Sequence, residues 1–218
     1  MPENQVVMSF SQVISLLATV TFSVSGVLAA RGVRIDIFGV IVVGVVTAVG
    51  GGTIRDVILD VPIFWIADNT YLMAATVAAL AAFFLLDSIS RRYTLLLYLD
   101  ALGVALFASG AIVKTLGMGF GPLIAAVMGV ITGIGGGLIR DLLTGRPTLI
   151  MSRDLYATPI LFGVSVQILL MSYLGLGTQL ATLAGGVLIF FSRAAAIHFH
   201  LQMPDVLTTG VRDSGNRP

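Results

Sequence analysis

Two charged glycine motifs lie inside long apolar stretches of the sequence. GGGTIRD occupies residues 50–56, the first motif, and GGGLIRD occupies residues 135–141, the second motif, 85 residues later. A charged side chain inside a membrane span costs several kcal/mol when it faces lipid, so such charges usually face one another or a polar pathway. The two motifs are therefore the first places to look for residues that handle ions or polar solutes in a membrane.

The triple glycines need a physical reason, because each costs on the order of 1 kcal/mol relative to alanine inside a helix. One reason is close packing, since small residues let two membrane helices approach. The other, which we favour, is a break or kink whose freed carbonyls line a wet cavity. On this interpretation the candidate residues of the pathway are Gly50, Gly51, Gly52, Arg55, Asp56, Gly135, Gly136, Gly137, Arg140 and Asp141.

The motif charges need partners. Adjacent helical residues such as Arg55 and Asp56 point about 100° apart, which predicts that they do not pair with each other. Asp100 lies at the depth of Arg140 in the predicted spans, and we predict that these two pair. Lys114 lies at the depth of Asp56, where it either competes with a permeating cation or simply extends to the membrane interface.

The composition indicates the class of protein in which these charges lie. Hydrophobic residues make up 57% of the 218 residues and charged residues 11%, and the mean hydropathy is +1.02. An ordinary soluble domain has roughly a quarter of its residues charged. The composition therefore excludes a water-soluble globule and predicts an integral membrane protein in contact with the lipid bilayer.

Uncharged runs of sufficient length predict an all-α membrane protein with seven transmembrane helices, because a hydrocarbon core of about 30 Å needs roughly 20 apolar residues. The predicted helices lie near residues 10–30, 37–59, 69–87, 94–114, 121–143, 155–174 and 179–198. The two motifs fall on the second and the fifth of these helices.

The motifs belong to a longer internal repeat. Residues 44–62 and 129–147 share ten identities in nineteen positions. Each copy lies on the second helix of a three-helix unit, and an odd number of helices inverts the second unit relative to the first. We therefore expect a 3+3 inverted repeat made of residues 10–87 and 94–174, with a seventh helix at 179–198, and a path at the interface of the two repeats.

Basic residues orient the predicted spans. The loops after the first, third and fifth helices, together with the C-terminal end, hold nine arginines, whereas the opposite side holds Lys114 at most. Because cytoplasmic loops carry the excess of Lys and Arg, residues 1–9 are expected outside and the tail 199–218 in the cytoplasm. The first nine residues include Glu3 and no Lys or Arg, which argues against a cleaved signal peptide.

Other function classes have little support. The net charge is +1 and no run of basic residues exceeds two, so nucleic acid is not an expected partner. The chain has no cysteine and two histidines, which leaves few residues for a metal site or a nucleophilic triad. We expect no enzymatic activity, no bound metal and no cofactor.

Two GGGxxRD motifs in a seven-helix inverted repeat resemble the trimeric intracellular cation channel (TRIC) family, in its prokaryotic branch. Shorter matching stretches are FSVSG at 22–26, DIFG at 36–39, LDALG at 99–103 and LYAT at 155–158. The resemblance implies a homotrimer in a prokaryotic inner membrane. It also implies an ion path inside each subunit, lined by the second and fifth helices and permeable to potassium and sodium.

Passive conduction of monovalent cations is the leading hypothesis from the sequence. One departure from the family concerns the first helix, where related sequences often carry an acidic residue corresponding to Asp100 and this chain offers Ser15 or Leu16. Members of the same broad bacterial family are also associated with glycine uptake. A small-amino-acid transporter is the alternative, in which half-helix N-termini would hold a carboxylate. A non-conducting scaffold would leave the charges inside the membrane without a role.

Overall fold

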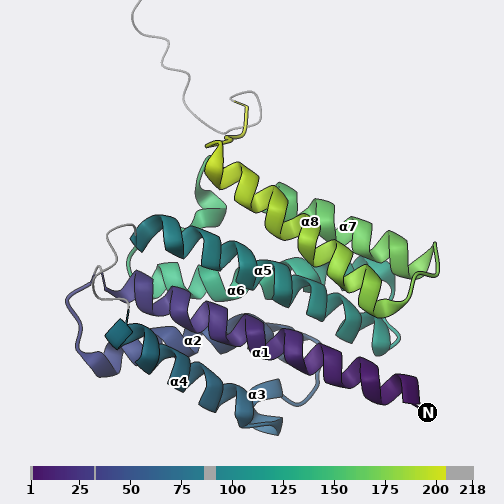
Figure 1. Cartoon of the computed structure of the whole chain (residues 1–218), viewed down its shortest axis with the longest axis horizontal. Helices are drawn as coiled ribbons and strands as arrows, with labels where there is room; N and C mark the ends of the chain where they lie inside the picture. Colours follow the sequence, from purple (N-terminus) through teal and green to yellow (C-terminus); the bar gives the residue numbers. More distant parts are fainter. Residues whose placement is uncertain (1, 32, 86–91, 205–218) are drawn as a thin grey trace, which may run out of the picture.

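The computed structural model describes residues 2–31, 33–85 and 92–204, and these residues form a bundle of helices (Figure 1). The α-helices are α1 (Pro2–Ala30), α2 (Ile37–Ile58), α3 (Phe64–Ala67), α4 (Thr70–Leu85), α5 (Arg92–Gly117), α6 (Pro122–Leu143), α7 (Ala157–Ser172) and α8 (Thr178–His198), and a 3₁₀ turn, η1 (Leu149–Met151), precedes α7. The all-α prediction is confirmed for the described residues.

Each of the seven predicted helices corresponds to a helix of the structure, with shifted ends. The largest shift is in α1, which begins at Pro2 rather than near residue 10. The short α3 and η1 were not predicted, because four and three residues are too few to show a helical period.

Among the residues that the structure describes, five helical segments are long and apolar enough to cross a membrane: Phe10–Ala30, Ile37–Ile58, Tyr93–Gly117, Pro122–Leu143 and Thr178–His198. The other two apolar helices, α4 and α7, have 16 residues each. At 1.5 Å per residue each is about 24 Å long, which is less than the hydrocarbon thickness of about 30 Å. A short helical element precedes each of them along the chain, α3 before α4 and η1 before α7.

The centre of the bundle consists of α1, α2, α5 and α6. In this group α2 packs against α6, α1 against α2 and α5, and α5 against α6. The helix α4 covers α1 and α2, while α7 and α8 pack together over α5, as Figure 1 shows. The two glycine motifs lie on α2 and α6 and therefore occupy the central pair.

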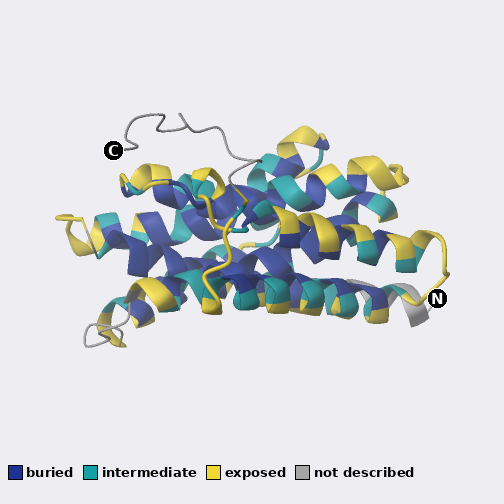
Figure 2. Cartoon of the chain, turned by 90° about the horizontal axis from the view of Figure 1, so that it is seen from above, coloured by how far each residue is buried: buried dark blue, intermediate teal, exposed yellow. Residues whose placement is uncertain are grey.

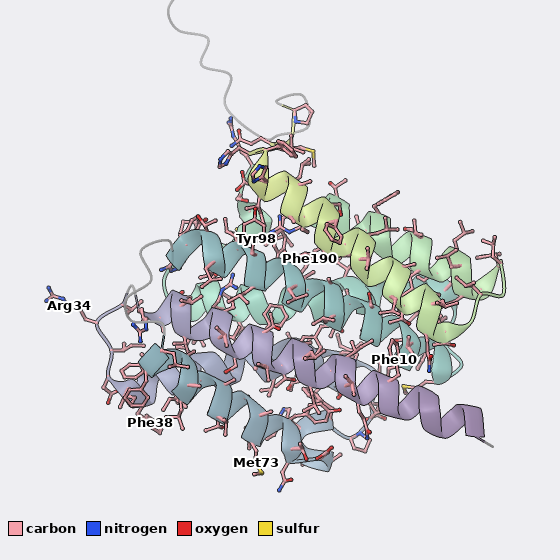
Figure 3. The ribbon with its side chains drawn as sticks, viewed as in Figure 1. Phe10, Arg34, Phe38, Met73, Tyr98 and Phe190 are labelled. Atoms are coloured by element: carbon pink, nitrogen blue, oxygen red, sulfur yellow. The ribbon has the colours of Figure 1, made fainter. Side chains whose placement is uncertain are left out.

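Figure 2 shows that the exposed residues lie on the outer faces of the helices and the buried residues inside the bundle. Many of the exposed residues are large and apolar, and the buried ones include charged side chains beside apolar ones. Phe38 and Met73 are exposed and point away from the bundle in Figure 3. Arg55, Asp56 and Arg140 are buried instead. An apolar exterior around a charged interior is the arrangement expected of a chain that is surrounded by lipid.

Polar residues fix two helix starts at the bundle ends. The Asp36 carboxylate accepts a hydrogen bond from the Gly39 amide at 2.8 Å and caps α2. Asp68 accepts from the Thr70 amide at 3.0 Å, and its hydrogen bonds with Thr70 lower the pKa of this carboxyl. Both helices therefore begin at positions set by the sequence.

The helices α2 and α6 continue through their glycines without interruption, so neither helix is broken there. A kink at the glycines stays a prediction. Gly51 and Gly136 instead form the crossing point of the two helices. A Cβ atom on Gly51 would collide with the Thr132 carbonyl oxygen, and one on Gly136 would lie 2.6 Å from the Thr47 carbonyl oxygen. Close approach of two backbones is therefore the reason that both positions require glycine.

Candidate functional site: two buried charge clusters

The first cluster consists of Arg55, Asp56 and Lys114 at the end of α2 that follows the glycines. Arg55 Nε donates to Asp56 Oδ1 at 2.8 Å, and Lys114 Nζ donates to the same oxygen at 2.6 Å. The Asp56 side chain is fully buried, whereas that of Lys114 is 31% exposed. One carboxylate therefore balances two cations, and only the lysine has access to the surroundings.

The pairing of neighbouring motif residues corrects the sequence prediction. Arg55 contacts Asp56, and Arg140 Nε likewise donates to Asp141 Oδ1 at 2.9 Å. The angle of about 100° between adjacent side chains applies where they leave the helix. Each arginine has a long flexible stem, so its guanidinium folds back over the following residue and reaches the carboxylate.

The second cluster consists of Arg140, Asp141, Asp100, Arg193 and Ser25, which come from four helices. Arg140 Nη1 donates to Asp100 Oδ1 at 2.8 Å, so the predicted contact between these residues is confirmed. The same nitrogen donates to Ser25 Oγ at 2.6 Å. Arg193 Nη2 lies 3.9 Å from Asp100 Oδ2. Two guanidinium groups and two carboxylates balance one another in this buried group.

The predicted proximity of Lys114 and Asp56 is also found, at 2.6 Å between Nζ and Oδ1. The lysine comes from the end of α5, 58 residues along the chain from the aspartate. An ammonium group on a buried carboxylate occupies the place that a permeating cation would take.

The chain after each motif turns in the same way. Asp60 and Gly145, 85 residues apart, both adopt positive φ angles, of 53° and 65°. Aspartate tolerates this left-handed conformation better than most residues that have a Cβ atom. Farther along, the amides of Phe64 and Leu149 donate to Oδ2 of the preceding motif aspartate, at 2.9 and 3.1 Å. The repeat in the sequence is therefore matched by a repeat in local contacts.

Aromatic rings and glycine backbone fill the space between the clusters. Phe22 and Phe107 stack with their centroids 5.7 Å apart, and Phe64 lies edge-on to Phe107 at 6.4 Å. The Phe22 ring also lies 3.6 Å from the place where a Cβ on Gly136 would be. Arg55 lies over the Phe64 ring at 5.8 Å, which joins the rings to the first cluster.

Sequence reasoning missed Arg193, Ser25 and Tyr156 as members of the site. Arg193 was counted among the arginines of the cytoplasmic side, although it is the one Lys, Arg, Asp or Glu within the predicted span 179–198. Its guanidinium lies over the Tyr156 ring at 4.3 Å. A charge inside an apolar span was the signal that could have identified it. Ser25 and Tyr156 carry no comparable signal.

Two more motif glycines, Gly52 and Gly137, lie against residues of the site. A Cβ on Gly137 would lie 2.7 Å from Asp100 Oδ1, and one on Gly52 would lie 2.5 Å from the Phe64 ring. Gly137 therefore makes room for the Asp100 carboxylate beside Arg140. Within residues 2–31, 33–85 and 92–204, no group of three or more His, Cys, Asp or Glu side chains is placed to hold a metal ion.

Comparison with known proteins finds a family model and close relatives. The model of a family described as Glycine transporter matches residues 12–87 and 97–172. The UPF0126 inner membrane protein YadS of Escherichia coli (strain K12) is 42% identical over 193 residues, which cover 88% of this chain and 93% of that protein.

Solved structures with the same fold are TRIC channels. The TRIC trimeric intracellular cation channel orthologue from Rhodobacter sphaeroides has a TM-score of 0.84 and 38% identity, over 88% of this chain and 98% of that one. A TRIC cation channel from a structural study of conductance has a TM-score of 0.78 and 29% identity, over 88% and 95% of the two chains.

Proposed function

Because the chain belongs to the UPF0126 membrane protein family and has the fold of TRIC channels, we propose that it is a passive channel for potassium and sodium ions. The family model that matches the chain is described as Glycine transporter. The observation that carries this proposal is the pair of buried charge clusters, one at each end of the central helices α2 and α6. Charges in the interior of an apolar bundle mark an ion pathway more often than a structural core.

The proposed pathway runs inside one subunit along α2 and α6. Its mouths are the two clusters, where the carboxylates of Asp56 and Asp141 attract cations and the neighbouring arginines limit how tightly a cation is held. Its middle is the crossing of Gly51 and Gly136, with the Phe22 and Phe107 rings beside it. Because backbones and rings touch there, we infer that this conformation is closed and that conduction requires α2 and α6 to separate.

Lys114 is proposed as the residue that controls the first mouth. Its ammonium lies on Asp56 in this conformation, yet its side chain is 31% exposed and its stem is flexible. A cation that displaces the ammonium would find the carboxylate ready to receive it. The proposed role is therefore that of a tethered competitor.

The architecture of the membrane-embedded form is proposed as a homotrimer of seven-span subunits. Matched contacts 85 residues apart support an inverted repeat, and the arginine-rich loops support a cytoplasmic C-terminus. We place the chain in the inner membrane because the E. coli relative is described as an inner membrane protein.

A glycine transporter is the second candidate, favoured by the description of the matching family model. The path is closed between the two clusters, at the crossing of α2 and α6. A closed centre is also expected of a transporter with alternating access, in which one mouth opens at a time. The two functions differ in stoichiometry, because a channel passes many ions in one opening and a transporter moves few solutes per cycle.

Purified protein in planar bilayers and in liposomes separates these functions. A channel gives discrete current steps under a potassium gradient without glycine, and its liposomes gain no more labelled glycine than protein-free liposomes. The proposal is wrong if the recordings stay silent at every voltage while the same preparation takes up glycine. Current steps that appear only with glycine present would also contradict passive cation conduction.

A further inference from the structure

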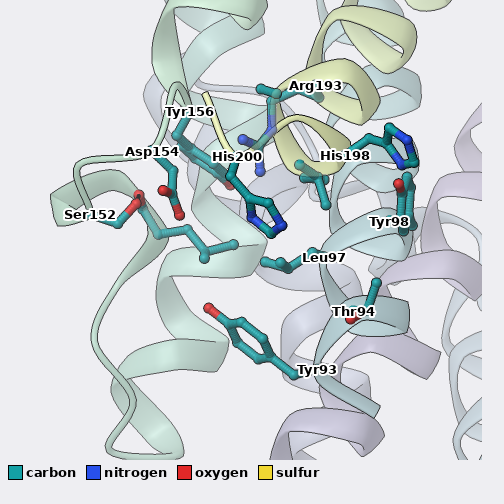
Figure 4. Close-up of a pocket in the computed structure, with 13 residues that line it drawn as sticks. Tyr93, Thr94, Leu97, Tyr98, Ser152, Asp154, Tyr156, Arg193, His198 and His200 are labelled. Carbon is teal, nitrogen blue, oxygen red and sulfur yellow. Dashed lines mark hydrogen bonds between the residues drawn. The ribbon is translucent and has the colours of Figure 1, made fainter. Parts of the chain in front are cut away.

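A cavity of about 290 Å³ lies beside the second cluster, between the start of α5, the end of α8 and the loop that precedes α7. Figure 4 shows Arg193, His200, Asp154 and Tyr156 on one side of this cavity and Tyr93 on the opposite side. Neither the charge pairing nor the proposed ion path explains why a polar cavity is built here.

The Arg193 side chain is one of the polar groups that line the cavity. It is 2% exposed, and Nη1 donates to the Leu155 carbonyl oxygen at 2.8 Å. Its Nε donates no hydrogen bond to any group of the described residues. A buried donor without an acceptor is costly, especially on a charged group. An acceptor that reached Arg193 from the cavity would therefore meet a donor that is not fully satisfied, and an anion would suit it best.

The guanidinium is also held in a fixed orientation. One face lies over the Tyr156 ring at 4.3 Å, and Nη2 lies 3.9 Å from Asp100 Oδ2. A planar group that is fixed by stacking loses little conformational freedom when it binds a planar carboxylate. Arg193 is thus preorganised for a ligand that carries such a group.

The rim of the cavity is fixed by backbone pairing. The Leu155 amide donates to the Leu201 carbonyl at 3.2 Å, and Asp154 forms an isolated antiparallel bridge with Gln202. Between these contacts and α8, His200 has a φ angle of 51°, a left-handed conformation that residues with a Cβ atom rarely adopt. The turn presents the His200 imidazole to the cavity, as Figure 4 shows. Strain of this kind persists where the surroundings hold it, often at binding sites.

We propose that this cavity binds a small organic carboxylate. Its carboxylate would accept hydrogen bonds from Arg193, and its body would contact Tyr93, Leu97 and Ile197. The Asp154 carboxylate on the wall disfavours a multiply charged anion such as phosphate. A volume of about 290 Å³ is near the lower end of small-molecule pockets, so a ligand with an apolar body fills it better than glycine does.

Binding here would act on the second cluster, because Arg193 is shared. A carboxylate on Arg193 competes with Asp100, and Asp100 in turn holds Arg140. The cavity is thus a place where a small metabolite of this class can regulate the protein. The proposal does not depend on whether the chain is a channel or a transporter, because ligand binding is measured without transport.

Calorimetric titration of the purified full-length protein in detergent tests the proposal, with benzoate as the probe and benzamide as its neutral counterpart. We expect benzoate to bind and benzamide to bind about tenfold more weakly or not at all, since a hydrogen bond to a charged group is lost. Acetate, glycine and inorganic phosphate are expected to bind more weakly than benzoate.

A cavity-filling variant locates the site. Thr94 is exposed and lines the cavity, so Thr94→Trp blocks the space without removing a charge. We expect it to weaken benzoate binding at least about tenfold. The control Thr70→Trp makes the same change at an exposed threonine at the start of α4, outside this cavity, and should bind as the unmodified protein does.

Several results would overturn the proposal. These are the absence of benzoate binding, equal binding of benzoate and benzamide, and unchanged binding by Thr94→Trp. Phosphate that binds as tightly as benzoate would indicate a general anion site, and tighter binding of glycine would indicate an amino-acid site. Each of these outcomes is distinct from a failure of ion conduction.

Discussion

The backbone amides of Phe64 and Leu149 make the same hydrogen bond at the two ends of the bundle, each to Oδ2 of the aspartate that ends the preceding motif. Phe64 begins α3 and Leu149 begins η1. Each motif aspartate therefore has two functions, since one oxygen binds the neighbouring arginine and the other fixes the short helix that follows.

Replacing the two aspartates should have unequal effects. Asp56→Asn leaves the buried Arg55 facing an amide, and we expect a loss of about 3–5 kcal/mol in the free energy of unfolding. Asp141→Asn should cost less, about 1–3 kcal/mol, because Arg140 keeps Asp100. Unfolding in mixed micelles with increasing denaturant measures both. Equal losses, or the reverse order, would show that Asp100 does not compensate.

Asp100 and Arg140 should show strong energetic coupling. Asp100→Asn should cost about 1–3 kcal/mol, because Arg140 keeps Asp141. Arg140→Gln should cost about 3–5 kcal/mol, because two buried carboxylates lose their partner. The double variant should cost less than the sum of the two by about 1–3 kcal/mol. A double-mutant cycle on unfolding free energies gives the coupling. Additive losses would contradict the role assigned to the 2.8 Å contact.

The central glycine of the first motif should tolerate alanine much less than its neighbour does. Gly51→Ala pushes a methyl group onto the Thr132 carbonyl, so a backbone must move, at a cost of about 1–3 kcal/mol. Gly50→Ala meets the end of the flexible Ile139 side chain and should be nearly neutral. Unfolding free energies and potassium currents are measured for both. Similar stabilities of the two variants would exclude close packing as the reason for Gly51.

Removing the charge of Lys114 should raise cation conduction. Lys114→Met frees the Asp56 carboxylate, and we expect up to about tenfold higher single-channel potassium conductance at low salt. The gain should shrink in about 1 M salt, where charges are screened within about 3 Å. The control Lys114→Arg keeps the charge and should behave like the unmodified channel. A conductance that does not change with Lys114→Met would leave the lysine as an anchor of α5 only.

The proposed orientation can be tested directly, because the chain contains no cysteine. Met118→Cys, after the end of α5, should react with a maleimide that cannot cross the membrane when it is added to intact cells. Arg34→Cys, between α1 and α2, should react only after the cells are permeabilised. Both side chains are exposed in the structure. The reverse pattern of labelling would invert the topology.

The fold was largely predictable from the sequence because membrane helices depend on long apolar runs. The contact between Asp100 and Arg140 was also predicted, because an inverted repeat would put the two residues at the same depth. The sequence did not show that α2 and α6 stay continuous through their glycines. A helix stays continuous through glycines when contact with a neighbouring helix compensates their cost in helix stability. Here the backbones of α2 and α6 approach closely at Thr47 and Thr132, which only the structure shows.

The composition of the clusters was predicted only in part. Depth along a helix predicts which charges are level with each other, but not how far a long side chain bends. The contact between Arg55 and Asp56 depends on that bending and was missed for this reason. Ser25 could not be singled out, because a serine in a membrane helix is usual, and its role depends on Arg140 being within 2.6 Å.

The residues of the second cluster lie far apart along the chain, and this affects how the protein enters the membrane. During synthesis Asp56 follows Arg55 directly, so the first motif leaves the ribosome with its charge already paired. Asp100 leaves 40 residues before Arg140. An unpaired aspartate inside a membrane helix is unfavourable, by up to about 2.5–3.5 kcal/mol at the helix centre on insertion scales. We therefore expect α5 to stay beside the insertion machinery until α6 is made, so that the two helices enter the bilayer together.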